Sequence, residues 1–255
     1  RQAVASLPIV LPALTCDALR ATDFSAAVGA KVTINHTEMQ TSAQGSWCKV
    51  SATIAPEIGV QIALPTQRWS QRFLQVGCGG LCGSINLSLS NASGCLPAMN
   101  GEFVVAATDM GHHGSMMDAS WAEDPQKRID FAWRANHLTA VLAKAVMQTL
   151  YRQPPKYAYF MGCSDGGREA LMEAQRFPQD FDGISAGAPA AFFQFQNSFF
   201  HGWNVAANQR PDGTAILLKN RLPLIHQAVL AHCPTLSGVQ DGILRSEEHT
   251  SELQS

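Results

Sequence analysis

Apolar and polar residues alternate over short runs in the first part of the chain, a pattern typical of β-strands with one buried face. Such runs lie at 31–36, 47–54 and 60–64, and prolines follow the second and the third. Three strands at such short spacing favour antiparallel pairing at one edge of a sheet.

Later apolar runs do not alternate, which is typical of strands buried on both faces. They lie at 72–76, 102–107, 156–161 and 181–186. Between them, apolar residues recur every three to four positions over 126–151, which predicts a long helix. Shorter helices are expected at 168–177 and 221–231. Strands that alternate with helices predict parallel crossovers, and therefore a mostly parallel, doubly wound α/β sheet.

One glycine-rich turn joins a predicted strand directly to a predicted helix. It reads Gly162-Cys163-Ser164-Asp165-Gly166-Gly167, and Gly-x-Ser-x-Gly in this context is typical of a nucleophile elbow. A turn this sharp strains the serine, and only glycines let the neighbouring backbone pass so close. We predict Ser164 as a nucleophile and the N–H of Asp165 as a donor to an oxyanion. The plainer interpretation is a turn that holds a serine by chance, and the flanking elements favour function.

The composition excludes several classes of protein. The chain has 255 residues, enough for one large α/β domain, and its net charge of −2 without a basic stripe argues against a nucleic-acid partner. No apolar run reaches the roughly 18 residues that a membrane-spanning helix needs, so no membrane partner is expected. Seven cysteines favour disulfides, and hence a secreted or periplasmic protein. Their odd number leaves at least one unpaired within the chain.

Together these motifs resemble the tannase and feruloyl esterase family of α/β-hydrolases. The matching stretches are 73–80, 107–112, 129–135, 162–169 and 181–190. The resemblance implies an α/β-hydrolase fold and a serine carboxylic ester hydrolase. Its substrates would be small aromatic esters, such as feruloyl or galloyl esters.

The resemblance also assigns roles within the site. Ser164 would be the nucleophile, and Asp165 and Gly79 would supply the two oxyanion N–H groups. A loop after a neighbouring buried strand supplies the second donor in this fold, which agrees with the place of Gly79. A plain glycine-rich turn is the alternative for that loop.

The family pattern further implies disulfide bonds. Cys16 and Cys48 would form an amino-terminal pair, and Cys163 would pair with a cysteine beside the catalytic histidine. Cys82 and Cys95 are expected to form a further pair, with the pairing of Cys78 left open. Cys233 and Cys163 have no expected partner in this chain.

A calcium site in the lid of family members uses the pattern Cys-Asp-x-x-Asp-Gly-Val-x-Asp-Gly. The corresponding stretch, 233–242, has Pro234 and Ser237 at two of the three carboxylate positions. Calcium prefers several anionic oxygens, so Asp241 alone argues against a calcium ion. We therefore expect no cofactor, with Asp241 as the only candidate metal ligand.

The pattern divides the chain into four parts. We assign 1–30 to an amino-terminal arm, 31–190 to the first part of the catalytic domain and 191–244 to the start of a lid. Residues 245–255 are polar and resemble a translated sequencing adapter, so we assign them to a non-native tail.

The base and the acid of a catalytic triad are expected outside this chain. The triad order in this fold is Ser, Asp, His, and the family places the last two after its lid. We therefore assign the base role to none of His112, His113 or His232, and hold Asp109 to be structural. The chain alone is expected to have negligible turnover.

A second function class fits the same residues. A non-catalytic, hydrolase-like protein would bind a phenolic ligand through the aromatic-rich stretch 192–203. The plainer interpretation of that stretch is packing. Another hydrolase activity, such as that of a peptidase or lipase, is disfavoured by the Cys163-Ser164 pair.

Overall fold

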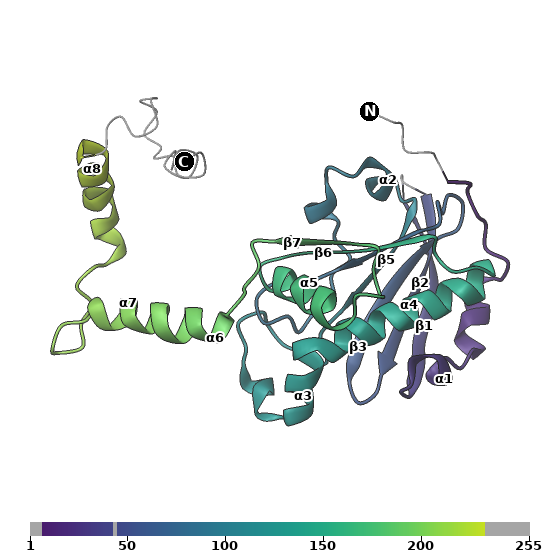
Figure 1. The fold of residues 1–255 in the computed structure, drawn as a ribbon, viewed down its shortest axis with the longest axis horizontal. Coiled ribbons are helices and arrows are strands. Elements are labelled where there is room, and N and C mark those ends of the chain that lie inside the picture. Colours follow the sequence, from purple (N-terminus) through teal and green to yellow (C-terminus); the bar gives the residue numbers. More distant parts are fainter. Residues whose placement is uncertain (1–6, 43–44, 233–255) are drawn as a thin grey trace. The chain divides into compact units, whose positions relative to one another are not determined.

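A computed structural model of the chain describes residues 7–42 and 45–232. The chain divides into two compact units, Arg1–Ala191 and Phe192–Ser255. The first unit contains a seven-stranded sheet in the order β1-β2-β3-β5-β4-β6-β7 (Figure 1). The strands are β1 (Val32–Ser42), β2 (Gly45–Ile54), β3 (Ile58–Pro65), β4 (Arg72–Val76), β5 (Phe103–Thr108), β6 (Tyr157–Cys163) and β7 (Gly183–Gly187).

The sheet is mixed, as the sequence predicts. β1, β2 and β3 pair antiparallel and β3 pairs antiparallel with β5, whereas β5, β4, β6 and β7 are parallel. The alternating runs thus form the antiparallel edge, and the continuous apolar runs form the parallel part. The predicted α/β fold class is confirmed.

Helices join the parallel strands. The α-helices of this unit are α1 (Ser25–Val28), α2 (Leu96–Met99), α3 (Pro125–Ile129), α4 (Ala135–Tyr151) and α5 (Asp165–Arg176). Three 3₁₀ turns, η1 (Cys16–Ala21), η2 (Ser90–Ala92) and η3 (Ser120–Glu123), and a π-helical segment, η4 (Asp130–Arg134), complete it. The long helix predicted over 126–151 is therefore α3, η4 and α4 in succession.

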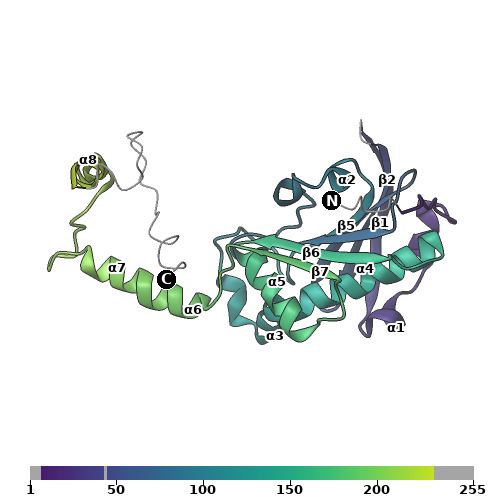
Figure 2. The same ribbon diagram turned by 45° about the horizontal axis from the view of Figure 1, so that its top comes forward.

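Both faces of the parallel sheet are covered: the crossover from β4 to β5, with η2 and α2, lies on one face, and the next two crossovers, with α4 and α5, lie on the other (Figure 2). Phe73, Val104 and Phe160 pack in the core with residues of α4 and α5. Their chain neighbours Leu74 and Phe103 point to the other face, in a cluster with η2 and α2. β4 pairs with β6 up to Val76 opposite Met161, so the carboxyl ends of these two parallel strands lie beside each other, where the site forms.

Residues 7–30 pack against this sheet. Leu19 in η1 and Phe24 before α1 are buried in the main core. Cys16 forms a disulfide with Cys48 in β2, as the family resemblance implied. A covalent bond and apolar packing thus attach this segment to the antiparallel edge.

The second unit is helical. It contains α6 (Phe193–Phe195), the π-helical η5 (Gln196–His201), α7 (Gly202–Ala207), η6 (Lys219–Arg221) and α8 (Leu222–His232). The ring of Phe195 stacks on that of Phe199 with centroids 5.2 Å apart, and Phe200 meets both rings edge-on. These rings are exposed, so packing into a core does not explain them within this unit. Over the described residues, no helix is long and apolar enough to cross a membrane.

Several predictions fall on residues that the structure does not describe. Cys233, Asp241 and the polar tail at 245–255 lie outside the described residues. The division of the chain into four parts, with boundaries at 31, 191 and 245, stays a prediction.

Candidate active site

Ser164 occupies the turn between β6 and α5. Its side chain is exposed, and its backbone has φ 62° and ψ −116°, a conformation that costs energy in any residue with a Cβ. The strain persists because the elements on both sides are fixed by the sheet and the helix. This is the conformation that the elbow motif predicted for the serine.

Close backbone contacts explain the glycines of the elbow. A Cβ on Gly162 would lie 2.2 Å from the carbonyl oxygen of Gly166, and one on Gly167 would lie 2.5 Å from that of Gly187. A Cβ on Gly166 would lie 2.9 Å from the carbonyl oxygen of Cys78. All three oxygens that such a Cβ would meet are backbone atoms, which cannot move aside as a flexible side chain could.

The end of β7 holds the serine backbone in place. The Ser164 N–H donates to the carbonyl oxygen of Gly187 at 3.0 Å, and the Ala190 N–H donates to the carbonyl oxygen of Ser164 at 3.0 Å. The hydroxyl group is therefore presented from a backbone fixed on two sides.

The loop after β4, Gly77–Gly83, lies against the elbow; we call it the glycine loop. The Gly77 N–H donates to Met161 in β6, and the Gly166 N–H donates to the Cys78 carbonyl, both at 2.9 Å. A Cβ on Gly79 would meet nothing within 4 Å, so its peptide borders open space. The Asp165 N–H is in the first turn of α5, where backbone donors lack intrahelical acceptors.

A second loop, after β5, supports the glycine loop. His112 Nε2 lies 2.8 Å from the Leu81 carbonyl oxygen, and the imidazole stacks on Trp121 with ring centroids 4.1 Å apart. Burial lowers the pKa of His112, so the neutral ring donates its Nε2–H to Leu81. The Leu81 N–H donates to the Met116 carbonyl at 2.7 Å.

No histidine among the described residues forms a hydrogen bond with the Ser164 hydroxyl. His113 Nδ1 lies 3.4 Å from Asp109 Oδ2 instead. Asp109 Oδ1 accepts the N–H groups of Gly59 and Gly111, each at 2.9 Å, and burial raises the pKa of Asp109 to about 6. These contacts give Asp109 a structural place at the end of β5.

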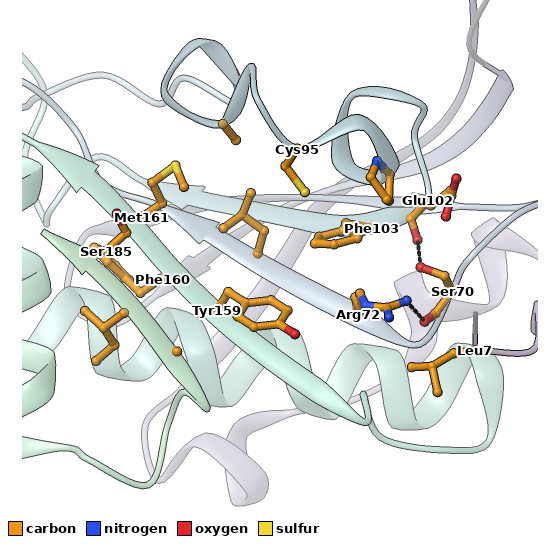
Figure 3. A pocket seen from close by; sticks show the side chains of 15 residues that line it. Leu7, Ser70, Arg72, Cys95, Glu102, Phe103, Tyr159, Phe160, Met161 and Ser185 are labelled. Carbon is orange, nitrogen blue, oxygen red and sulfur yellow. Dashed lines mark hydrogen bonds between the residues drawn. The ribbon is translucent and has the colours of Figure 1, made fainter. Parts of the chain in front are cut away.

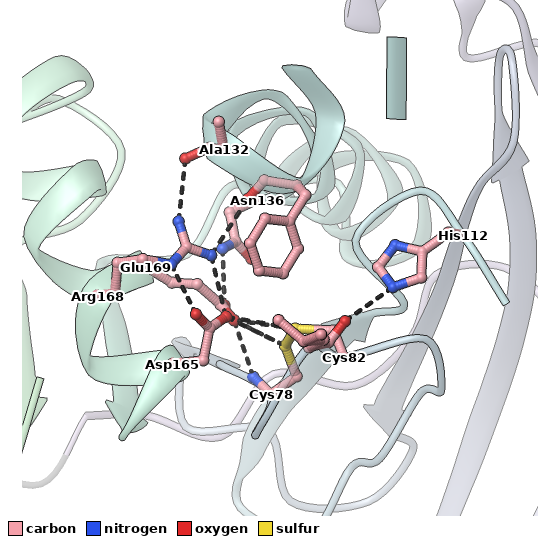
Figure 4. Close-up of polar contacts among 10 residues, drawn as sticks. Cys78, Cys82, His112, Ala132, Asn136, Asp165, Arg168 and Glu169 are labelled. Atoms are coloured by element: carbon pink, nitrogen blue, oxygen red, sulfur yellow. Dashed lines mark hydrogen bonds and ion pairs between the residues drawn. A yellow bond between two sulfur atoms is a disulfide. The ribbon is translucent and has the colours of Figure 1, made fainter. Parts of the chain in front are cut away.

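Three acids lie on one buried face of α5, at successive turns: Asp165, Glu169 and Glu173. Asp165 accepts two bonds from the Arg168 guanidinium, at 2.7 and 2.9 Å. Arg168 also donates to the carbonyls of Phe131 and Ala132 in the π-helical segment (Figure 4). This clamp attaches the start of α5 to η4.

The second acid, Glu169, contacts the glycine loop. Its Oε1 accepts the Cys78 N–H at 3.2 Å, and its Oε2 accepts the Asn136 side-chain amide at 2.8 Å. Burial and the nearby Asp165 raise the pKa of Glu169 to about 8. The sequence motifs did not single out Glu169 or Asn136. A signal was present in β4, where the polar Gln75 interrupts an otherwise apolar strand.

The cysteine prediction was wrong in one respect. Cys82 is bonded to Cys78 within the glycine loop, and Cys95 is free. Cys95 precedes α2 and lines a cavity on the sheet face, whereas Cys82 is held beside α5, so the fold separates the two. Cys163 is free and exposed within the described part of the chain.

The four side chains of Cys78, Cys82, Asp165 and Glu169 are compact enough to suggest a metal site, with potential ligand atoms within 4.8 Å of one another. Their chemistry does not fit one. The two sulfurs are bonded to each other, and both carboxylates already accept hydrogen bonds from Arg168, Asn136 or backbone. We therefore assign no metal to this cluster.

Two of the cavities within the described part of the chain bear on the position of the site. One, of about 270 Å³, is bordered by Gly79, Cys163 and a row of serines, and lies next to the elbow. A larger one, of about 610 Å³, lies on the face that carries α2. It is lined by apolar residues, including Phe103, Tyr159 and Met161, and by the charged Arg72 and Glu102 (Figure 3). Neither Ser164 nor the glycine loop lines this larger cavity, so it is not the candidate active site.

A mixed sheet with a serine elbow after β6 and a glycine loop after β4 defines the α/β-hydrolase class. The family model for tannase and feruloyl esterase matches residues 41–251, and the chain belongs to that family.

Relatives and solved structures agree with this assignment. The chain is 38% identical over 190 residues to Probable feruloyl esterase B-2 of Aspergillus flavus, covering 73% of this chain and 34% of that protein. It is 30% identical over 226 residues to the mono(2-hydroxyethyl) terephthalate hydrolase of Piscinibacter sakaiensis, covering 77% and 37%. The crystal structure of feruloyl esterase B from Aspergillus oryzae superimposes with a TM-score of 0.72 at 25% identity, covering 90% of this chain and 48% of that one. The chain thus spans about a third of the length of these curated relatives.

Proposed function

We propose that the chain carries the nucleophile and the oxyanion donors of a serine carboxylic ester hydrolase that acts on esters of small aromatic acids. One observation carries the proposal. The exposed Ser164 sits on a strained turn that leads into α5 at Asp165, and the glycine loop contacts that first helical turn through the bond from the Gly166 N–H to the Cys78 carbonyl.

In the proposed reaction, Ser164 Oγ attacks the ester carbonyl carbon, and the bond to the alcohol oxygen breaks. The acyl group stays on Ser164 until water releases it as the free acid. The N–H groups of Asp165 and Gly79 would hold the carbonyl oxygen as it gains negative charge. A base must take the hydroxyl proton and return it to the leaving alcohol.

The base and its orienting acid are expected outside this chain. Among the described residues, no side chain is hydrogen-bonded to the Ser164 hydroxyl, so it has no proton acceptor there. A serine hydroxyl without a base is a poor nucleophile. We therefore expect residues 1–255 alone to have negligible turnover.

The substrate class is supported by the names of the relatives, which are feruloyl esterases and a mono(2-hydroxyethyl) terephthalate hydrolase. The acyl groups in those names are aromatic acids. The two disulfide bonds support an oxidising compartment, and hence a secreted or periplasmic protein.

A rescue experiment tests the proposal on the chain itself. Methyl ferulate and methyl gallate are incubated with residues 1–255 in rising concentrations of imidazole, which can replace a missing base, and release of the free acid is measured by chromatography. We expect imidazole-dependent release and a covalent acyl group on Ser164 by mass spectrometry. The Ser164→Ala protein in the same buffer gives the background. Equal release by both proteins at every imidazole concentration, together with no acyl group on Ser164, would refute the proposal.

The alternative is a binding protein without catalysis. It predicts that phenolic ligands bind equally to the wild-type and Ser164→Ala proteins, with no acylation at any imidazole concentration. The strained conformation of Ser164 favours the enzyme, because a binding protein gains nothing from that strain.

A further inference from the structure

A buried chain of hydrogen bonds ends on the glycine loop. The Gln75 side-chain amide in β4 donates to both the side-chain oxygen and the backbone carbonyl of Asn136 in α4, each at 3.0 Å. Asn136 donates to Glu169 in α5 at 2.8 Å, and Glu169 accepts the N–H of Cys78 at 3.2 Å (Figure 4). A strand, two helices and the loop are thus joined by polar groups.

Helix α5 holds Cys78 at two points. The Cys78 N–H donates to Glu169, and the Cys78 carbonyl accepts from the Gly166 N–H at 2.9 Å. The Cys78 carbonyl and the Gly79 N–H belong to one planar trans peptide, so they point in opposite directions. Fixing that carbonyl toward the first turn of α5 therefore turns the Gly79 N–H away from the helix. Within the described residues, that N–H donates to no backbone carbonyl.

We propose that Glu169 is a positioning residue, whose carboxyl group holds the glycine loop against the amino end of α5 and so sets the direction of the Gly79 N–H. The proposal rests on the proposed function, because it treats that N–H as an oxyanion donor.

The charges around Glu169 make this bond sensitive to pH. On its own helix, Glu169 faces Asp165 and Glu173. The nearby Arg168 forms its ion pair with Asp165 and not with Glu169. From α4 it meets the neutral Asn136, and from the loop it meets the disulfide, with Cys78 Sγ 2.7 Å from Oε1. Burial and Asp165 raise the pKa of Glu169 to about 8. The closed arrangement therefore favours the protonated acid, whereas a loop opened to water would let the acid ionise at its ordinary pKa.

The sign of the effect follows from proton linkage. Between the ordinary pKa and about 8, the closed loop holds one proton more than the opened loop. Opening is therefore favoured as the pH rises through this window, by up to about tenfold per pH unit, and the effect levels off above about 8. A buried side chain that only filled space would give no such profile.

Amide hydrogen exchange of residues 1–255, followed by NMR, tests the proposal without a substrate. In the wild type, we expect the protection factors of the Cys78 and Gly166 N–H groups to fall as the pH rises from 5 to 8. Glu169→Gln keeps a polar acceptor without a charge, so these amides should be protected at all pH values with a flat profile. Glu169→Leu should lose protection by about tenfold or more at pH 6, while the Ile62 amide in β3 stays protected.

Glu173→Gln is the matched control, because Glu173 is the other acid of α5 with a raised pKa and its side chain does not contact the glycine loop. In this variant, the protection factor of the Cys78 N–H should fall with pH as steeply as in the wild type. The proposal is wrong if Glu169→Gln keeps that slope, or if Glu169→Leu protects the loop as well as the wild type does. If Glu169→Leu does not fold, comparing the two glutamine variants still decides. Neither result depends on ester hydrolysis, so failure here is distinct from failure of the rescue experiment.

Discussion

The backbone carbonyl of Cys78 accepts a hydrogen bond from the N–H of Gly166 at 2.9 Å. This bond joins the loop after β4 to the first turn of the helix after β6, across 88 positions of sequence. It requires the two backbones to touch, which is why Gly166 has no side chain. The site is therefore built from backbone contacts as much as from the serine.

Because of those contacts, we expect a single added methyl group to lower the stability of the protein strongly. Gly162→Ala places a Cβ 2.2 Å from the Gly166 carbonyl oxygen, so we expect a loss of about 3 kcal/mol or more in the free energy of unfolding, or no folding. Urea denaturation measures it. Gly79→Ala is the control, because its Cβ meets nothing within 4 Å and should change stability by less than about 1 kcal/mol. Equal losses in both variants would contradict this account.

The strain at Ser164 predicts a gain in stability when it is relieved. Ser164→Gly allows φ 62° and ψ −116° without a Cβ, whereas Ser164→Ala keeps the Cβ and the strain. We expect the glycine variant to be about 1 kcal/mol more stable than the alanine variant, measured by thermal and urea unfolding. An alanine variant as stable as the glycine variant would show that the turn is not strained.

Glu173 predicts how stability depends on pH. It is fully buried, neither carboxyl oxygen has a hydrogen-bond partner within the described residues, and burial raises its pKa to about 8. The folded state then holds a proton that the unfolded state releases near the ordinary glutamate pKa of 4.5. The stability from Glu173 is therefore present at acid pH and is lost as the pH rises to about 8.

Replacing that acid should flatten the profile. We expect Glu173→Gln to stabilise the protein by about 1–3 kcal/mol at pH 8 and by much less at pH 5. Unfolding midpoints at several pH values measure this. Glu57→Gln, an exposed acid paired with Lys127 at 2.9 Å, should leave the pH profile unchanged. A wild-type stability that rises from pH 5 to 8 would argue against a protonated Glu173.

The Cys16–Cys48 bond predicts a loss of stability on removal. It closes a loop with a sequence separation of 32. Such a cross-link lowers the conformational entropy of the unfolded chain and so raises the free energy of unfolding by about 3–4 kcal/mol. The Cys16→Ala/Cys48→Ala double variant should therefore unfold at a lower urea concentration under oxidising conditions. Reducing agent should lower the midpoint of urea unfolding of the wild type toward that of the variant. The midpoint of the variant itself should change little. A variant as stable as the wild type would mean that packing of Leu19 and Phe24 alone holds this segment.

The strands, the long helix and the elbow could be predicted from the amino-acid sequence alone. Alternating runs and continuous runs predicted the two kinds of strand, because the periodicity of a strand depends on how many of its faces are buried. The glycines around Ser164 predicted the turn, because the neighbouring backbone passes too close for a side chain at those positions. These are short-range properties, which neighbours along the chain decide.

The partners of Cys82 and Glu169 were decided only by the tertiary structure. Cys82 lies 4 positions from Cys78 and 13 from Cys95, and spacing alone did not show which thiol the glycine loop brings near. Gln75, Asn136 and Glu169 come from a strand and two helices, and each resembles an ordinary polar residue in its own segment. Their hydrogen bonds exist because the crossovers stack α4 and α5 on one face of the sheet, beside the end of β4. Which distant residues meet depends on the packing of whole elements, and no local pattern in the chain encodes that directly.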